Sequence, residues 1–101
     1  MATLYITEFA EIQGGDNNGK VPVVKLPPLA EQTVAIGAET DSAAFNAATK
    51  FIRVHCDAIC SIKVAATGNP AATTSSMRLP ADHTEYFAVD AGGKLSVISN
   101  T

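Results

Sequence analysis

The two cysteines and two histidines of this 101-residue chain are the side chains best suited to metal or redox chemistry. Cys56 and Cys60 are close enough for a disulfide across a strand-turn-strand junction, although two buried thiols are the expected state in a reducing compartment. A zinc site needs about four ligands, and only His55 and His83 could join the cysteines. In an extended segment His55 lies on the face opposite Cys56. We therefore expect no metal and no other cofactor.

Other patterns that carry chemistry are missing from the sequence. No Gly-x-Ser-x-Gly motif presents a nucleophilic serine, and the serines fall in loops without a neighbouring base. Gly14-Gly15 and Gly92-Gly93 lack the lysine and the helix of a phosphate-binding loop, so both indicate turns. The carboxylates, from Glu8 to Asp90, are spread along the chain and are interpreted as a solvated acidic surface. We predict that the chain is not an enzyme.

The elements that would position any site are short apolar and β-branched runs separated by Gly, Pro, Asn and Asp. These predicted strands are Thr3 to Phe9, Lys20 to Leu26, Gln32 to Ile36, Phe51 to Cys56, Ser61 to Ala65, Glu85 to Val89 and Lys94 to Ile98. Their spacing is typical of an all-β fold, a small antiparallel β-sandwich or jelly-roll-like barrel. The length suits one domain, residues 1–101, in which residues 1–19 form a strand or arm and a flexible loop.

The connections are less uniform than the strands. Asp90 to Lys94 is predicted to be a hairpin between the last two strands, and Gly68 and Gly93 suit a positive φ. Asp41 to Lys50 could form a short alanine-rich helix or a strand and irregular chain, and the β surroundings favour the second. Thr67 to Ser76 is a small polar loop, either a surface excursion or a partner contact.

The N-terminal strand carries apolar residues on both faces, because Leu4 and Ile6 alternate with Tyr5 and Phe9. Such a strand is either buried on both sides or covered by another chain. Strand edges and arms can continue a neighbour's sheet, so this segment is our candidate docking element. The predicted partner-binding residues are Thr3, Leu4, Tyr5, Ile6, Thr7 and Phe9.

The net charge of −3 argues against a nucleic-acid partner, because Lys and Arg are scattered singly. No apolar run is long enough to span a membrane, and the first residues lack the pattern of a signal peptide. We expect the protein in a cytoplasm. Its core contains few aromatic residues, so self-association or docking on a larger particle would add useful burial.

The second half of the chain resembles small proteins that decorate or cement the capsids of tailed bacteriophages. The likeness covers about residues 42 to 99 and rests on general layout, with no active-site signature. Its segments are Thr49-x-Phe51-Ile52-Arg53-Val54-x-x-Asp57-Ala58, Gly68-Asn69-Pro70-x-Ala72-Thr73, Arg78-Leu79-Pro80-Ala81, Glu85-Tyr86-Phe87-x-Val89 and Gly93-Lys94-Leu95-Ser96-Val97-Ile98.

The resemblance implies a β-sandwich subunit that binds the major capsid protein from outside, as a dimer or trimer, and reinforces the shell. It would then be found on the virion surface, and in the host cytoplasm during assembly. A small phage tail or neck component is an alternative with similar architecture. A β-sandwich module that binds carbohydrate or peptide is another, and it would need exposed aromatic side chains such as Tyr5 or Tyr86.

Overall fold

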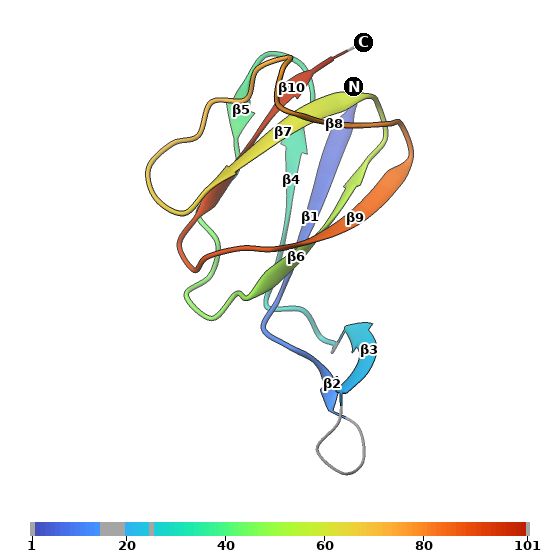
Figure 1. Cartoon of the computed structure of the whole chain (residues 1–101), viewed down its shortest axis with the longest axis vertical. Helices are drawn as coiled ribbons and strands as arrows, with labels where there is room; N and C mark the ends of the chain where they lie inside the picture. Colours follow the sequence, from blue (N-terminus) through green and yellow to red (C-terminus); the bar gives the residue numbers. More distant parts are fainter. Residues whose placement is uncertain (1, 15–19, 25, 101) are drawn as a thin grey trace.

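A computed structural model describes residues 2–14, 20–24 and 26–100, and this part of the chain contains ten β-strands and no helix. Eight strands form two four-stranded antiparallel sheets that pack face to face, and the other two form a hairpin (Figure 1). The strands are β1 (Thr3–Phe9), β2 (Ile12–Gly14), β3 (Lys20–Val24), β4 (Ala30–Ala35), β5 (Thr40–Asp41), β6 (Phe51–Cys56), β7 (Cys60–Ala65), β8 (Met77–Leu79), β9 (His83–Ala88) and β10 (Lys94–Ser99). The predicted antiparallel β-sandwich is confirmed.

The first sheet has the strand order β4-β1-β6-β9 and buries one face of each inner strand. Leu4 and Ile6 on β1 pair with Cys56 and Val54 on β6, and all four side chains are buried. Period-2 alternation turns the residues between them outward, which is why the burial of β6 alternates along its whole length.

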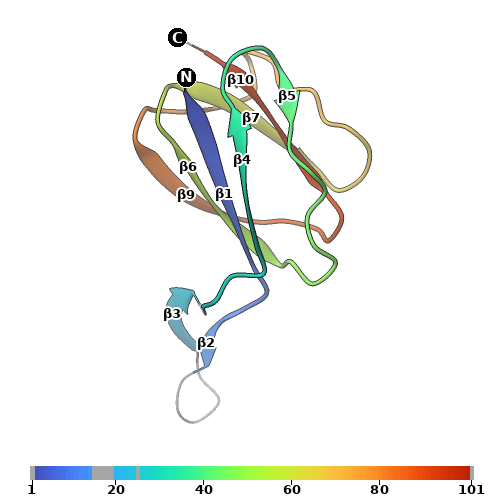
Figure 2. The same ribbon diagram turned by 180° about the vertical axis from the view of Figure 1, so that it is seen from behind.

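The second sheet has the order β5-β10-β7-β8 and supplies the other half of the core. Leu95 and Val97 of β10 are buried opposite Val64 and Ile62 of β7. The core cluster therefore consists mainly of aliphatic side chains from the two facing sheets, and Phe45 adds a buried aromatic ring to it. Figures 1 and 2 show the two layers from opposite sides.

The predicted hairpin at Asp90 to Lys94 is wrong. β9 lies at the edge of the first sheet, whereas β10 lies inside the second, so this turn carries the chain across the sandwich. Gly92 has the positive φ of 75°, which was expected of Gly93. Gly93 is needed for a different reason, since a Cβ there would lie 2.6 Å from the carbonyl oxygen of Ala65. Gly68 has a φ of 75°, as predicted.

One flank of the sandwich is covered by the chain between β5 and β6, and we call it the closed flank. This segment is irregular, as favoured from the sequence, because its hydrogen bonds go to both sheets. Ser42 bonds twice with Leu95, since its N–H donates to the Leu95 carbonyl (2.6 Å) and its Oγ accepts the Leu95 N–H (2.9 Å). The Phe45 N–H donates to Gly93 O (2.8 Å), which holds the Phe45 ring in the core.

Glu8 joins the same segment to the first sheet, and its interpretation as a solvated carboxylate is wrong. Its side chain is 2% exposed. Oε1 accepts hydrogen bonds from the Asn46 N–H (2.7 Å) and the Thr49 hydroxyl (2.7 Å), and Oε2 accepts one from Gln32 Nε2 (3.3 Å). Three neutral donors satisfy the buried carboxylate, as a buried charge requires.

The hairpin of β2 and β3 lies in the connection between β1 and β4, two strands that are direct neighbours. It extends from the sandwich along the longest dimension of the molecule, 46 Å (Figure 1). The predicted strand from Lys20 is present as β3, and Pro22 lies in a hairpin strand that pairs only with β2. The predicted flexible loop at Gly14 to Gly19 falls mostly outside the described residues.

Three short strands were not predicted, and the boundaries of five others shifted, those of β3, β4, β7, β9 and β10. β5 has two residues, and β2 and β8 have three each, too few for a visible alternation. β4 begins two residues before the predicted Gln32, β7 begins at Cys60, and β9 begins at His83. Propensity places such boundaries poorly because pairing with a neighbouring strand decides where each one starts.

Candidate interaction face

The solvent side of the first sheet, called the outer face below, collects side chains from four strands. Their pleat directs them away from the core. The outer face consists of Thr3, Tyr5, Thr7, Glu31, Thr33, Arg53, His55, Thr84 and Tyr86. It includes two of the large exposed hydrophobic side chains, Tyr5 at 44% and Tyr86 at 50% exposure.

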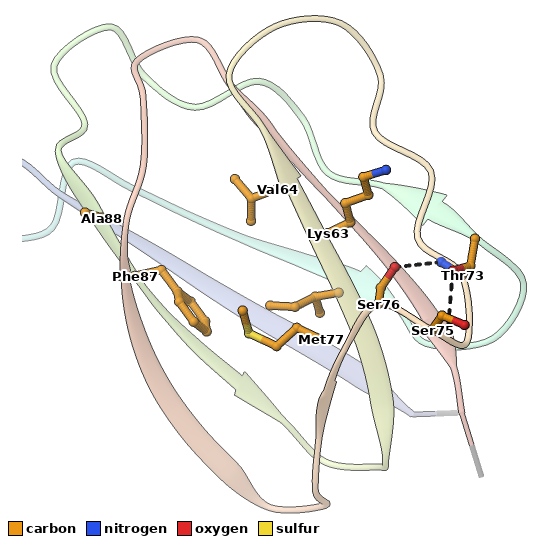
Figure 3. A pocket seen from close by; sticks show the side chains of 9 residues that line it. Lys63, Val64, Thr73, Ser75, Ser76, Met77, Phe87 and Ala88 are labelled. Carbon is orange, nitrogen blue, oxygen red and sulfur yellow. Dashed lines mark hydrogen bonds between the residues drawn. The ribbon is translucent and has the colours of Figure 1, made fainter.

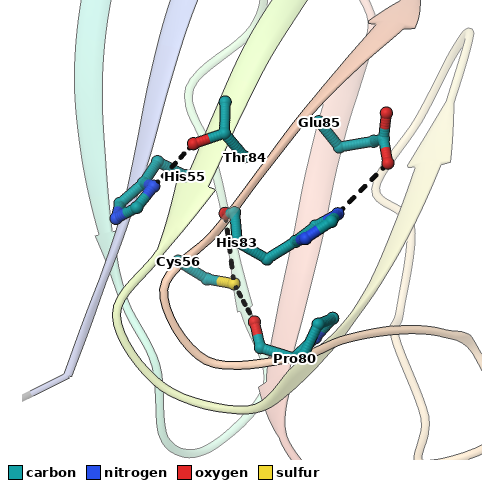
Figure 4. A network of polar contacts seen from close by, with 6 residues as sticks. All are labelled: His55, Cys56, Pro80, His83, Thr84 and Glu85. Atoms are coloured by element: carbon teal, nitrogen blue, oxygen red, sulfur yellow. Dashed lines mark hydrogen bonds and ion pairs between the residues drawn. The ribbon is translucent and has the colours of Figure 1, made fainter.

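A first row of side chains crosses the face through Tyr5. Tyr5 lies between Thr33 on β4 and His55 on β6, and His55 is paired with Thr84 on β9. The Tyr5 and His55 rings are 6.2 Å apart and tilted by 45°. His55 Nδ1 lies 2.8 Å from Thr84 Oγ1, a contact drawn in Figure 4. The row therefore holds its imidazole between an aromatic ring and a hydroxyl.

A second row runs parallel to it, through Thr7, Arg53 and Tyr86. Arg53 Nη2 donates to Thr84 Oγ1 at 3.5 Å, so Thr84 links the two rows. The guanidinium and the neighbouring Tyr86 ring are partly accessible to solvent. The outer face thus combines one cation with aromatic rings and hydroxyls, a composition typical of protein surfaces that bind other molecules.

The structure divides the six predicted partner-binding residues into two groups. Leu4 and Ile6 are core residues, and Phe9 is 2% exposed with its ring stacked 5.3 Å from that of Phe51. Thr3, Tyr5 and Thr7 lie on the outer face. β1 is not an arm or an edge strand, since β4 and β6 pair with it on both sides. The proposed docking through its backbone edge is therefore wrong, while partner binding by its outward side chains stays a prediction.

The contact between His55 and Thr84 does not form a catalytic triad. A nucleophilic hydroxyl needs a base that is itself oriented by a third group, commonly a carboxylate. Among the described residues no carboxylate bonds to His55, and the nearest charged partner of Thr84 is Arg53. The contact is better suited to fixing side chains on the face than to activating an oxygen.

Cys56 and Cys60 are free thiols at the crossing from the first sheet to the second, and both are buried. Burial, and then the neighbouring Cys56 thiol, raises the pKa of Cys60 to about 12. Cys56 donates to the carbonyl of Pro80 (3.0 Å), as Figure 4 shows. A protonated buried thiol is a poor nucleophile and a poor metal ligand, so Cys60 packs as a small apolar group.

The second histidine has a different environment, at the edge of the first sheet. His83 Nε2 lies 3.2 Å from Glu85 Oε2, and both side chains are well exposed. Across the described residues, no three Cys, His, Asp or Glu side chains are grouped closely enough to hold a metal ion.

Sequence reasoning missed Arg53, His55, Thr84 and Tyr86 as members of one surface. The alternation along β6 indicated that Arg53 and His55 share a face. Nothing local indicated that β9 lies beside β6, because a gap of 26 residues separates Cys56 from His83.

Comparisons with known proteins give no relative for this chain: no family model, no curated protein and no solved structure matches it. In the described part of the chain, no helix has the length and hydropathy to cross a membrane.

Proposed function

We propose that this chain is a structural protein of a bacteriophage virion that binds the outside of the capsid and reinforces the coat lattice, without enzymatic activity. The observation that supports this best is the outer face, a surface of paired strands that presents two half-exposed tyrosines and, among its described residues, no catalytic arrangement. The resemblance of residues 42–99 to capsid decoration proteins implies that the partner is the major capsid protein.

The size of the outer face supports attachment to a repeating lattice. Four strands about 4.8 Å apart and six residues long cover roughly 19 by 20 Å, or about 400 Å². A stable interface buries about 800 Å² on each partner. One such contact would be weak, whereas a dimer or trimer that makes several contacts on a symmetric shell gains avidity.

A carbohydrate- or peptide-binding module is the second candidate, because Tyr5 and Tyr86 lie on one face. They are separated by β6 and by two residues along the strands, which places them about 12 Å apart. That distance suits an extended ligand that contacts both rings. A tail or neck component would use the same face on a different part of the virion.

The experiment is co-sedimentation of the purified chain with capsids of the phage whose genome encodes it, followed by counting of bound copies. We expect many copies per shell. Tyr5→Ser with Tyr86→Ser should reduce occupancy at least tenfold, whereas Leu26→Ser, at a position that is 67% exposed and lies outside the face, should leave occupancy unchanged.

Other results would overturn the proposal. A few copies at one vertex would indicate a tail or neck component. If no copies bind and sugars raise the melting temperature, the carbohydrate-binding alternative is favoured. Deleting residues 2–9 is not a useful test, because it would remove a central strand.

A further inference from the structure

The flank opposite the closed one is open, and it contains a cleft of about 430 Å³ between the edges of the two sheets. We call it the open flank. Phe87 on β9 points into the cleft from the first sheet, and Met77 and Val64 point into it from the second (Figure 3). Met77 is 55% exposed and Val64 is 37% exposed, although the pleat directs both side chains toward the core. Apolar side chains that face inward are thus left uncovered.

The open flank exists because β8 is shorter than the strand beside it. β8 pairs with β7 only from Cys60 to Ile62, and Ile62 lies opposite Met77. Before Met77 the chain turns away, with Ser76 donating its N–H to the Thr73 carbonyl (2.9 Å). Lys63, Val64 and Ala65 therefore have a strand neighbour on the β10 side alone in the described structure.

The backbone groups of Val64 point toward this gap. Val64 is the direct partner of Leu95, whose N–H and C=O both bond to Ser42 on the far side of β10. In an antiparallel pair whose two residues do not bond to each other, each residue points its N–H and C=O away from the partner strand, toward the next strand on its other side. The N–H and C=O of Val64 therefore face the position where β8 would continue, and no described residue bonds to them.

The two sides of this gap differ in chemistry. On the inner side a strand added beside β7 would meet Val64, Phe87 and Met77, which are apolar. On the outer side it would meet Lys63 and the polar side chains of Thr73, Ser75 and Ser76. Figure 3 shows Lys63 and Val64 on opposite sides of β7. Lys63 is the single charged residue that lines the cleft, and no described carboxylate pairs with it.

From this geometry we infer that the open flank binds an extended peptide segment of another protein, which adds to the second sheet as a strand antiparallel to β7. Directly paired residues share a face, so the peptide residue opposite Val64 is apolar and the next one, opposite Lys63, is acidic. Backbone bonds to Val64 give affinity, and the apolar-acidic pair gives specificity. This inference concerns a surface apart from the outer face and does not depend on the proposed function.

The test uses the whole chain labelled with ¹⁵N and a capped peptide, Ser-Thr-Val-Thr-Val-Glu, titrated to roughly millimolar concentration. We expect shifts of the amide signals of Lys63, Val64 and Ala65, and slower hydrogen exchange at Val64. Methylating the nitrogen of the last valine removes one backbone donor and should weaken binding about fivefold. A second peptide, in which lysine replaces the final glutamate and which we call the Lys-ended peptide, should bind about threefold more weakly than the first.

A charge exchange provides the matched control. Lys63→Glu changes an exposed side chain and should preserve the melting temperature, while it reverses the preference so that the Lys-ended peptide binds better. The inference is overturned if neither peptide shifts the Val64 signal, or if both peptides bind both proteins equally. Concentration-dependent shifts at Val64 without peptide would also overturn it, because a second copy of the chain would then be the occupant.

Discussion

The closed and open flanks of the sandwich are both formed by edge strands, but a connecting segment covers the gap between the sheets only at the closed flank. At the closed flank, residues 42–50 cross the gap and bond to both sheets, and the Phe45 ring is 3% exposed. At the open flank the chain turns away before Met77, which is 55% exposed. The comparison teaches that burial at a sandwich edge depends on the connecting chain more than on the strands, and that an uncovered edge is available for binding.

The largest expected difference is between truncations on the two flanks. Phe45→Ala leaves a cavity in the core and should lower the free energy of unfolding by about 4 kcal/mol. Met77→Ala removes a half-exposed side chain and should cost less than about 1 kcal/mol. Urea unfolding of both variants measures the contrast. Equal losses would contradict the distinction between the flanks.

Glu8 provides the next largest effect, because it holds the covering segment of the closed flank. Glu8→Ala leaves the Asn46 N–H and the Thr49 hydroxyl without their acceptor, and we expect a loss of about 3 kcal/mol in unfolding free energy. Glu31→Ala, which removes an exposed carboxylate from neighbouring β4, should change it by less than about 0.5 kcal/mol. A loss at Glu8 no larger than that at Glu31 would show that the carboxylate does not fasten the segment.

A substitution at Gly93 tests the close approach of its backbone to that of Ala65, next to the closed flank. Gly93→Ala would place its Cβ 2.6 Å from Ala65 O, a backbone atom, and should destabilise the fold by about 2 kcal/mol. Gly37→Ala is the matched control, since a Cβ there meets nothing within 4 Å. Thermal unfolding of the pair should separate them clearly. Similar melting temperatures would mean that the strands shift apart without cost.

The smallest effect concerns pH and tests whether the solvent at the open flank reaches the buried cysteines. The pKa of Cys60 is raised to about 12, so above about pH 9 the unfolded chain loses its proton first and the folded chain keeps it. The contribution of this thiol to the free energy of unfolding is therefore fully present below pH 9, and it falls as the pH rises toward 12. Urea midpoints between pH 8 and 10 should decline less steeply in Cys60→Ala. Parallel slopes would indicate a solvated thiol.

Much of the fold follows from local patterns in the sequence. β1 and β6 were predicted with their observed bounds because their alternation is strong and their inward residues are aliphatic. The pairing of strands did not follow, because turn residues such as Asp90 and Gly92 suit both a hairpin and a crossing between sheets. The site depends on that pairing, so Tyr5 and Tyr86 were named as separate candidates, while their place on one face with His55 and Arg53 was not predicted.

The burial of Glu8 is a second feature that could not be predicted from the sequence. In an alternating strand it occupies the same side as Leu4 and Ile6, which indicated an inward position. A carboxylate there is tolerated only when donors from distant residues surround it, and Asn46 and Thr49 are about forty positions away. Composition alone therefore assigned it to the surface.

The hairpin of β2 and β3 lies at one pole of the molecule, while β1 begins and β10 ends at the opposite pole (Figures 1 and 2). A fluorescent protein fused to the N-terminal end would thus be carried away from the hairpin. The C-terminal end lies close to one wall of the cleft, since the Asn100 side chain donates to the Thr74 carbonyl (3.1 Å), so a label placed there would report on binding at the open flank.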